Sequence, residues 1–389
     1  MENKELKAII QAVTDEQRIR KGESHRREAL FKVPPLLKDE KKLFLEQSQL
    51  VDEWLEQYSV NTGNPLKDEK RLDELAKEWN ALLNSIKFPI DNVTTKTRYT
   101  DSHTQKGVLE RVQGCLLGMA AGAWLNAITR EYSPSENAFS SLVWNIPFTW
   151  KPDDGIELAL ALANSLIKDK MFKPEAVYYA YLTWMLSRPF KENRPILTGI
   201  GEKTSTLLRT AVLACFGRNC ELTQVIHWCA LNVKITHPDP ICVFANEIYA
   251  VAVFFALKSG NPEELYEKTI EWGFKSENQE KTVLEALLRA STSPPNAPSQ
   301  GAICSLQNAF YQLLHAKTLT KGILSCVEDT FPVDRAICGA LLGATYGEKA
   351  FPEEWKKVLQ SSPLGEKRPP DYQPHNIFLI AEKLIASCI

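Results

Sequence analysis

Apolar residues beyond residue 107 recur at steps of three and four, and this spacing constrains the fold more than any other feature of the chain. Such spacing places apolar side chains on one face of an α-helix. Runs of alternating β-branched residues, which would indicate strands, are nearly absent. The clearest helical stretches are a stripe of Val108, Val112, Cys115, Leu116, Met119 and Ala123, then segments 158–166, 176–186 and 243–257. The sequence therefore predicts an all-α, multi-helix domain with long connecting loops such as residues 129–151.

The density of charged residues changes near residue 105. Residues 1–105 hold 19 acidic and 18 basic side chains, a denser charge than in the rest of the chain. We therefore divide the chain into a charged helical extension, 1–105, and a second domain, 106–389. In the extension we expect a helical hairpin, because two apolar stripes flank the turn-forming residues 61–65 and precede a polar linker, 91–105. The stripes consist of Leu43, Phe44, Leu50, Val51, Trp54 and Tyr58, and of Leu72, Leu75, Trp79, Leu82 and Ile86.

The amino-acid composition limits the binding partners and the cellular compartment that we expect for this protein. Of the 389 residues, 44% are hydrophobic, which is ample for a buried core. The formal net charge of −2 gives no basic field for nucleic acid or an anionic membrane surface, so neither partner is expected. The polar N-terminus lacks an apolar signal segment, and nine cysteines without a C-x-x-C pair indicate reduced core thiols. We expect a soluble cytoplasmic protein, although a signal for specialised secretion would leave no such trace.

Two adjacent carboxylates open one predicted helix. The segment Thr149-Trp-Lys-Pro-Asp-Asp-Gly155 places Asp153 and Asp154 before an alanine- and leucine-rich run. Because magnesium prefers oxygen ligands, paired carboxylates at a helix start can reach a metal in a cleft. The same pattern also forms an ordinary turn, in which aspartate caps the free N–H groups of the helix. The residues alone leave both interpretations open.

A second helix start carries a histidine and an aspartate among prolines. In Ile235-Thr-His-Pro-Asp-Pro-Ile241, Pro238 and Pro240 fix the approach to a long helix, and Asp239 can cap its free amides. His237 is interpreted either as a buried residue or as part of a ligand-binding surface.

Two further segments are apolar and rich in small residues. They are Arg111-Val-Gln-Gly-Cys-Leu-Leu-Gly-Met-Ala-Ala-Gly122 and Cys338-Gly-Ala-Leu-Leu-Gly-Ala-Thr-Tyr-Gly347. Together with the two helix starts, and in the same order, they resemble the motifs of the ADP-ribosylglycohydrolase family. The segment Ser205-Thr-Leu-Leu-Arg-Thr-Ala-Val-Leu213 resembles the Met-Arg-x-x-Pro segment of that family with the proline lost.

The resemblance implies a helical bundle that takes ADP-ribose or an ADP-ribosylated protein as its ligand. In active relatives, the counterparts of Asp153 and Asp154 bind one or both of two magnesium ions that hold the ribose and a nucleophilic water. Glu131 lies one place beyond the usual position of the glutamate that contacts the scissile ribose, where Arg130 stands here. The remaining ligand-binding candidates that the resemblance implies are His237, Asp239, Gly122 and Asn126.

The chain departs from the family pattern in its metal motifs. Gly122-Ala-Trp-Leu-Asn126 replaces a Gly-Asp-Ala-Leu-Gly turn, and Thr330 and Pro332 occupy two positions that are metal-binding aspartates in relatives. Asp329 and Asp334 lie one and two residues from those positions, so a local bulge could still bring one of them to a metal. A shift of one residue on a helix rotates a side chain by about 100°, which normally removes it from a site.

Three hypotheses follow. The first is a family member with a degenerate metal site, a pseudoenzyme that needs no cofactor and recognises ADP-ribose or an ADP-ribosylated protein. The second is an active hydrolase that uses magnesium, Asp153, Asp154 and either Asp329 or Asp334, with Glu131 assisting departure. The third is a helical interaction module in which residues 1–105 contact a protein partner.

Overall fold

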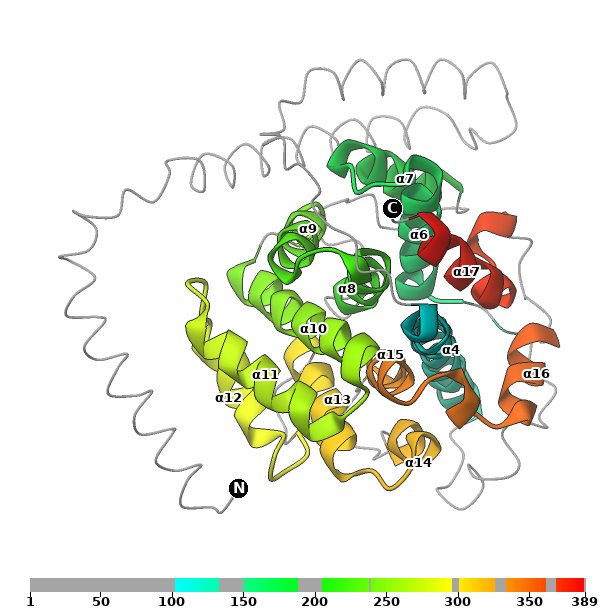
Figure 1. Cartoon of the computed structure of the whole chain (residues 1–389). Coiled ribbons are helices and arrows are strands. Elements are labelled where there is room, and N and C mark those ends of the chain that lie inside the picture. The colour runs from blue at the N-terminus through cyan, green and yellow to red at the C-terminus, as the bar shows by residue number, and fades with distance from the viewer. Residues whose placement is uncertain are drawn as a thin grey trace, which may run out of the picture. The chain divides into compact units, whose positions relative to one another are not determined.

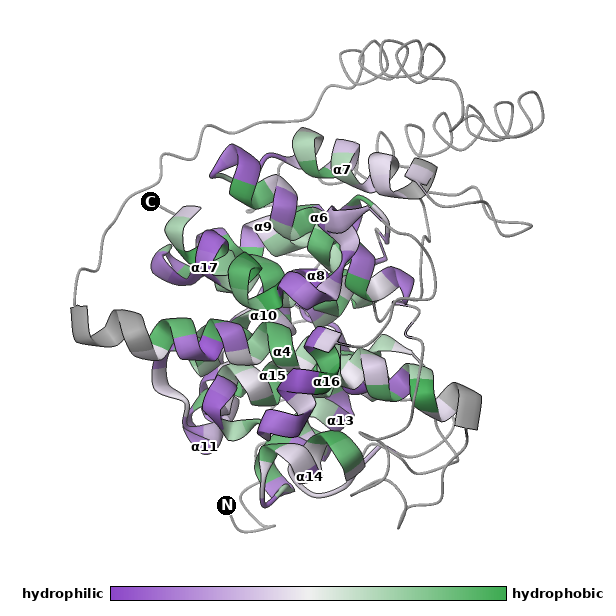
Figure 2. Cartoon of the chain, turned by 90° about the vertical axis from the view of Figure 1, so that its right-hand side faces the viewer, coloured by the Kyte–Doolittle hydropathy of each residue, from purple (hydrophilic) through white to green (hydrophobic). Residues whose placement is uncertain are grey.

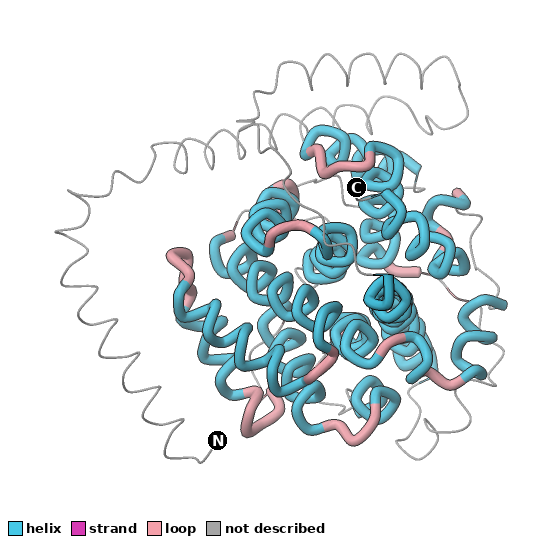
Figure 3. Tube along the Cα trace, in the orientation of Figure 1, coloured by secondary structure: helices cyan, strands magenta, loops and turns pink. Residues whose placement is uncertain are grey.

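The computed structural model describes residues 102–132, 150, 152–187, 205–237, 239–295, 301–325, 334–361 and 369–387. The predicted hairpin of the extension, and the linker up to residue 101, lie outside these residues. Apart from an isolated bridge at Trp150, the described part of the chain consists of helices, turns and loops, as Figure 3 shows.

Thirteen α-helices make up most of the described residues (Figure 1). In chain order they are α4 (Ser102–Tyr132), α6 (Asp154–Asp169), α7 (Pro174–Ser187), α8 (Ser205–Phe216), α9 (Leu222–Lys234), α10 (Pro240–Ser259), α11 (Pro262–Lys275), α12 (Lys281–Arg289), α13 (Ala302–His315), α14 (Leu319–Leu324), α15 (Arg335–Tyr346), α16 (Glu353–Ser361) and α17 (Ile377–Ser387).

The predicted all-α class is confirmed, and the segments 158–166, 176–186 and 243–257 lie within α6, α7 and α10. The ends of α4 differ from expectation. This helix begins at Ser102, inside the predicted linker, and continues to Tyr132, inside the predicted loop. Polar residues without apolar spacing can extend a helix whose middle is held by tertiary packing, so periodicity alone underestimates its length.

The local sequence sets where several helices begin and end. Asp153 and Asp239 are the N-caps of α6 and α10, and each side chain accepts a hydrogen bond from a backbone N–H of the first turn. Pro240 occupies the first turn of α10, where a missing N–H costs nothing. Helix α10 ends at Ser259, and the next residue, Gly260, caps it with a φ of 66°, in the left-handed region that favours glycine.

Helices α4 and α15 pack together through reciprocal glycines, which explains the small residues of both segments. A Cβ atom on Gly118 would overlap the carbonyl group of Gly339, and a Cβ on Gly339 would overlap that of Gly118. Gly114 and Gly343 form a second pair of the same kind. The backbones therefore approach so closely that no side chain larger than hydrogen fits at these positions. Running in opposite directions, the pair brings Gly122 of α4 against the first turn of α15.

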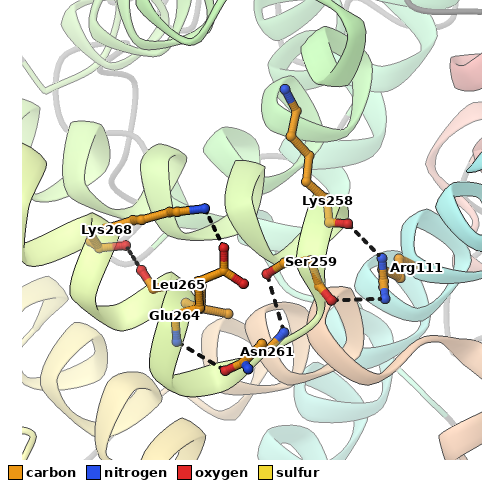
Figure 4. Close-up of polar contacts among 8 residues, drawn as sticks. Arg111, Lys258, Ser259, Asn261, Glu264, Leu265 and Lys268 are labelled. Atoms are coloured by element: carbon orange, nitrogen blue, oxygen red, sulfur yellow. Dashed lines mark hydrogen bonds and ion pairs between the residues drawn. The ribbon is translucent and has the colours of Figure 1, made fainter.

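Helix α10 lies among α8, α9, α11 and α15, and its end is tied to α4 (Figure 4). The Arg111 guanidinium donates to the carbonyl oxygens of Leu257, Lys258 and Ser259 at 3.4, 3.2 and 3.3 Å. The C-terminal carbonyls of a helix carry partial negative charge, so a cation there both satisfies and stabilises them. Arg111, the first residue of the segment 111–122, thus holds the C-terminal end of α10, the helix that follows His237 and Asp239.

Within the described part of the chain, two helices, at Gly107–Thr129 and Pro240–Ser259, are long and apolar enough to cross a membrane by length and composition. Most of each stretch is buried inside the bundle, as core helices of water-soluble proteins also are. Figure 2 shows the hydrophobic colour of α10 at the centre of the helices, with hydrophilic residues on outer helices such as α11.

Candidate functional site

Asp153 and Asp154 stand at the start of α6. Asp153 has an extended backbone, and its Oδ1 accepts a hydrogen bond from the Ile156 N–H at 3.0 Å. Asp154 is the first helical residue, and both aspartates are partly exposed, while the preceding Pro152 is buried. The structure therefore shows that Asp153 caps the start of α6. Capping one N–H through Oδ1 does not by itself exclude a further ligand.

A group of four polar residues, here called the Asn126 cluster, lies at the junction of α4 and α15. Its members are Asn126, Thr129, Asp334 and Arg335. Asn126 Nδ2 donates to Asp334 Oδ1 at 2.9 Å, and Asp334 Oδ1 also accepts from the Ala336 N–H at 2.9 Å. Asp334 is therefore the N-cap of α15. An oxygen that two N–H donors already occupy is poorly suited to a metal.

The same cluster contains a buried cation. The Arg335 Nη1 donates to Thr129 Oγ1 at 2.8 Å and to Asn126 Oδ1 at 3.3 Å. Gly122 lies one turn before Asn126, and its missing side chain makes room for the Arg335 backbone. Sequence reasoning identified Gly122, Asn126 and Asp334 but missed Thr129 and Arg335. Thr129 is three residues after Asn126, so the helical period would have placed both on one face.

His237 and Asp239 flank the start of α10. His237 is buried, and its Nδ1 lies 2.9 Å from Thr236 Oγ1. The same hydroxyl oxygen accepts a hydrogen bond from Arg209 Nη2 at 2.6 Å. Asp239 is exposed, and its Oδ1 accepts from the Cys242 N–H at 3.1 Å. The structure thus joins His237, through Thr236, to the arginine of the segment at 205–213.

Two other candidates have no described side chain. Glu131 lies in the last turn of α4, but only its helical backbone is described. Asp329 falls in 326–333, outside the described residues. Their parts in a site therefore stay predictions.

Two glutamates of the domain, Glu157 and Glu247, have buried carboxyl groups. Glu157, in the first turn of α6, is fully buried, and its Oε2 accepts from Trp184 Nε1 at 2.6 Å. Burial raises the pKa of Glu247 on α10 to about 7, although a hydrogen bond with Asn278 and the charge of Lys234 lower it. The buried carboxyl group of Glu247 therefore carries an energetic cost when it is ionised.

A magnesium centre needs several oxygen ligands at one place. Among the residues that the structure describes, no three His, Cys, Asp or Glu side chains lie together so as to hold a metal ion. Magnesium takes near-octahedral oxygen coordination, and a two-metal site needs carboxylates on both sides of the cleft. Asp334 Oδ1 instead accepts two N–H bonds, so the described donors do not by themselves complete a dinuclear magnesium centre.

The fold and these helix starts define an all-α, hydrolase-like domain. Residues 104–386 match the ADP-ribosylglycohydrolase family, and the chain belongs to that family. None of the curated proteins shows detectable similarity to the sequence. A solved structure described as an ADP-ribosylglycohydrolase-related protein complex is similar in fold, with a TM-score of 0.56 at 20% identity. The similarity covers 73% of this chain and 100% of that chain.

Proposed function

We propose that the protein is an ADP-ribosylglycohydrolase-fold receptor that binds ADP-ribose, or a protein carrying it, and does not hydrolyse it through metal ions. Family membership supports an ADP-ribose-related ligand. The residues that would form the ligand surface are Gly122, Asn126, His237 and Asp239. We also propose that the protein works in the cytoplasm and that residues 1–105 contact a protein partner.

The proposal rests on the hydrogen bonds that the Asp334 carboxylate makes. Its Oδ1 is bound by Asn126 and by the first turn of α15, while the buried Arg335 cation is held by the same asparagine. The Arg335 guanidinium, which donates to the same asparagine, supplies positive charge that does not depend on a metal. The helices of the family are therefore present, but the carboxylate of Asp334 caps a helix in this chain.

One observation favours an active hydrolase as a second candidate. Asp153 and Asp154 are adjacent and partly exposed at the start of α6. With Asp329, and with Glu131 to assist departure, they would be the groups available to a magnesium-dependent enzyme. In that case Asp153 would act as a metal ligand in addition to capping α6.

Two measurements on the purified full-length chain test the proposal. We expect no magnesium-dependent release of ADP-ribose from arginine- or serine-modified protein, and a rise of Tm with ADP-ribose, because a ligand that binds only the folded state stabilises it. The control for catalysis is the double variant Asp153→Ala, Asp154→Ala. Turnover that this variant loses would establish the hydrolase instead, and an unchanged Tm at millimolar ADP-ribose would argue against recognition.

A further inference from the structure

Arg209 of α8 is a fully buried cation whose hydrogen bonds are incomplete. Its Nη2 donates to Thr236 Oγ1 at 2.6 Å, and its Cζ lies 5.0 Å from the centre of the Tyr181 ring. Its Nε and Nη1 have no hydrogen-bond acceptor. No described carboxylate forms an ion pair with it, so the ring and one hydroxyl are its main polar surroundings.

A second incomplete donor belongs to a residue that contacts the same tyrosine. Asn232 of α9 is fully buried, and its Oδ1 accepts from the Tyr181 hydroxyl at 2.6 Å. Its Nδ2 has no acceptor. Arg209 and Asn232 therefore both contact Tyr181, and the atoms that lack partners are N–H donors in each case.

Physical chemistry limits what can complete this arrangement. An arginine guanidinium carries a positive charge, so its burial has to be balanced by its surroundings. Burying an unbalanced charge is strongly unfavourable, and a cation–π contact offsets only part of that cost. The missing component is thus an acceptor that carries negative charge. Guanidinium N–H groups match the oxygens of phosphate and carboxylate groups best.

We propose that Arg209 and Asn232 form a buried binding site for a small oxyanion, a phosphate or carboxylate group, next to Tyr181 and Thr236. The oxyanion accepts from Nε and Nη1 of Arg209 and from Nδ2 of Asn232. The site does not depend on ADP-ribose recognition, because free inorganic anions supply the same oxygens.

The test is the Tm of the full-length protein in sodium phosphate, sodium acetate and sodium chloride at equal pH and ionic strength. We expect an oxyanion to raise Tm by about 5 °C over chloride when it is near-saturating. A rise in phosphate alone identifies phosphate as the ligand, and a rise in acetate alone identifies a carboxylate. The Arg209→Met variant should lose the rise. Arg289→Met, the same change at an exposed arginine, should keep it.

If Arg209→Met does not fold, the variant Asn232→Asp tests the oxyanion site instead. Asn232→Asp keeps the acceptor for the Tyr181 hydroxyl and replaces the unpartnered amide with a carboxylate oxygen. It should have a higher Tm than wild type in chloride and show no further rise with an oxyanion. Equal Tm values of the wild type in the three salts, or a rise that survives in Arg209→Met, would overturn the proposal.

Discussion

Asn126 and Asp334, 208 residues apart in the chain, are joined by a 2.9 Å hydrogen bond from Nδ2 to Oδ1. The family's first motif normally ends in glycine where Asn126 stands, so this amide has a contact that glycine could not make. The close glycine packing of α4 on α15 brings the two residues together. One asparagine thus contacts the cap of α15 and the buried Arg335 at once.

The first prediction concerns this contact. Asn126→Ala should lower the free energy of unfolding by about 1–3 kcal/mol, because it removes the hydrogen bonds that Asn126 makes with Asp334 and with the buried Arg335. Asn164→Ala is a suitable control, since Asn164 makes a single exposed hydrogen bond to the Asp371 carbonyl. Urea unfolding of both variants measures the difference. Similar small losses in the two would mean that the Asn126 cluster adds little stability.

The glycine contact between α4 and α15 provides a matched pair of substitutions. Gly118→Ala should destabilise the protein by at least about 2 kcal/mol, because its Cβ would overlap the backbone of Gly339. Gly107→Ala, in the same helix, has no atom within 4 Å of its Cβ and should be neutral or stabilise by up to about 1 kcal/mol. Thermal unfolding monitored by circular dichroism compares them. Equal Tm values for the two variants would contradict the close packing.

Glu247 should make stability depend on pH. Burial raises the pKa of Glu247 to about 7 from its usual 4.5, so the folded state binds the proton more tightly than the unfolded state. This contribution is fully present below pH 4.5 and is lost as pH rises towards 7 and above. At pH 8, Glu247→Gln should stabilise the protein by up to about 3 kcal/mol. Glu271→Gln, at an exposed site, is the control, and an unchanged pH profile in Glu247→Gln would exclude this role.

Asp153 can be tested as a cap separately from any metal. Asp153→Ala should cost about 1 kcal/mol through loss of the α6 cap, whereas Asp153→Asn, which still caps, should cost only a few tenths. Under the non-catalytic proposal, neither magnesium nor a chelator changes the Tm of the wild type. A magnesium-dependent rise in the wild type that Asp153→Asn abolishes would show that the carboxylate binds metal.

Helix type and approximate position were predictable because they depend on local sequence. The period of three to four residues in segments such as 243–257 reports the buried face of a helix, and residues such as Asp239, Pro240 and Gly260 act on their own helix. The ends of α4 were less predictable, since Ser102 and Tyr132 lie beyond the periodic stripe. Packing further along the helix extends it there.

The site depended on contacts between residues far apart in the chain. The sequence by itself determined that Asp153 and Asp239 stand at helix starts, because a cap acts on the next few residues. Only the tertiary structure decided that Asp334 binds Asn126 and that Arg209 lies buried beside Thr236 with no carboxylate from the described residues paired to it. Whether a polar side chain caps a helix, binds a ligand or carries a buried charge depends on its burial and on partners far away in the chain. The spacing of residues along the sequence gives no information on either.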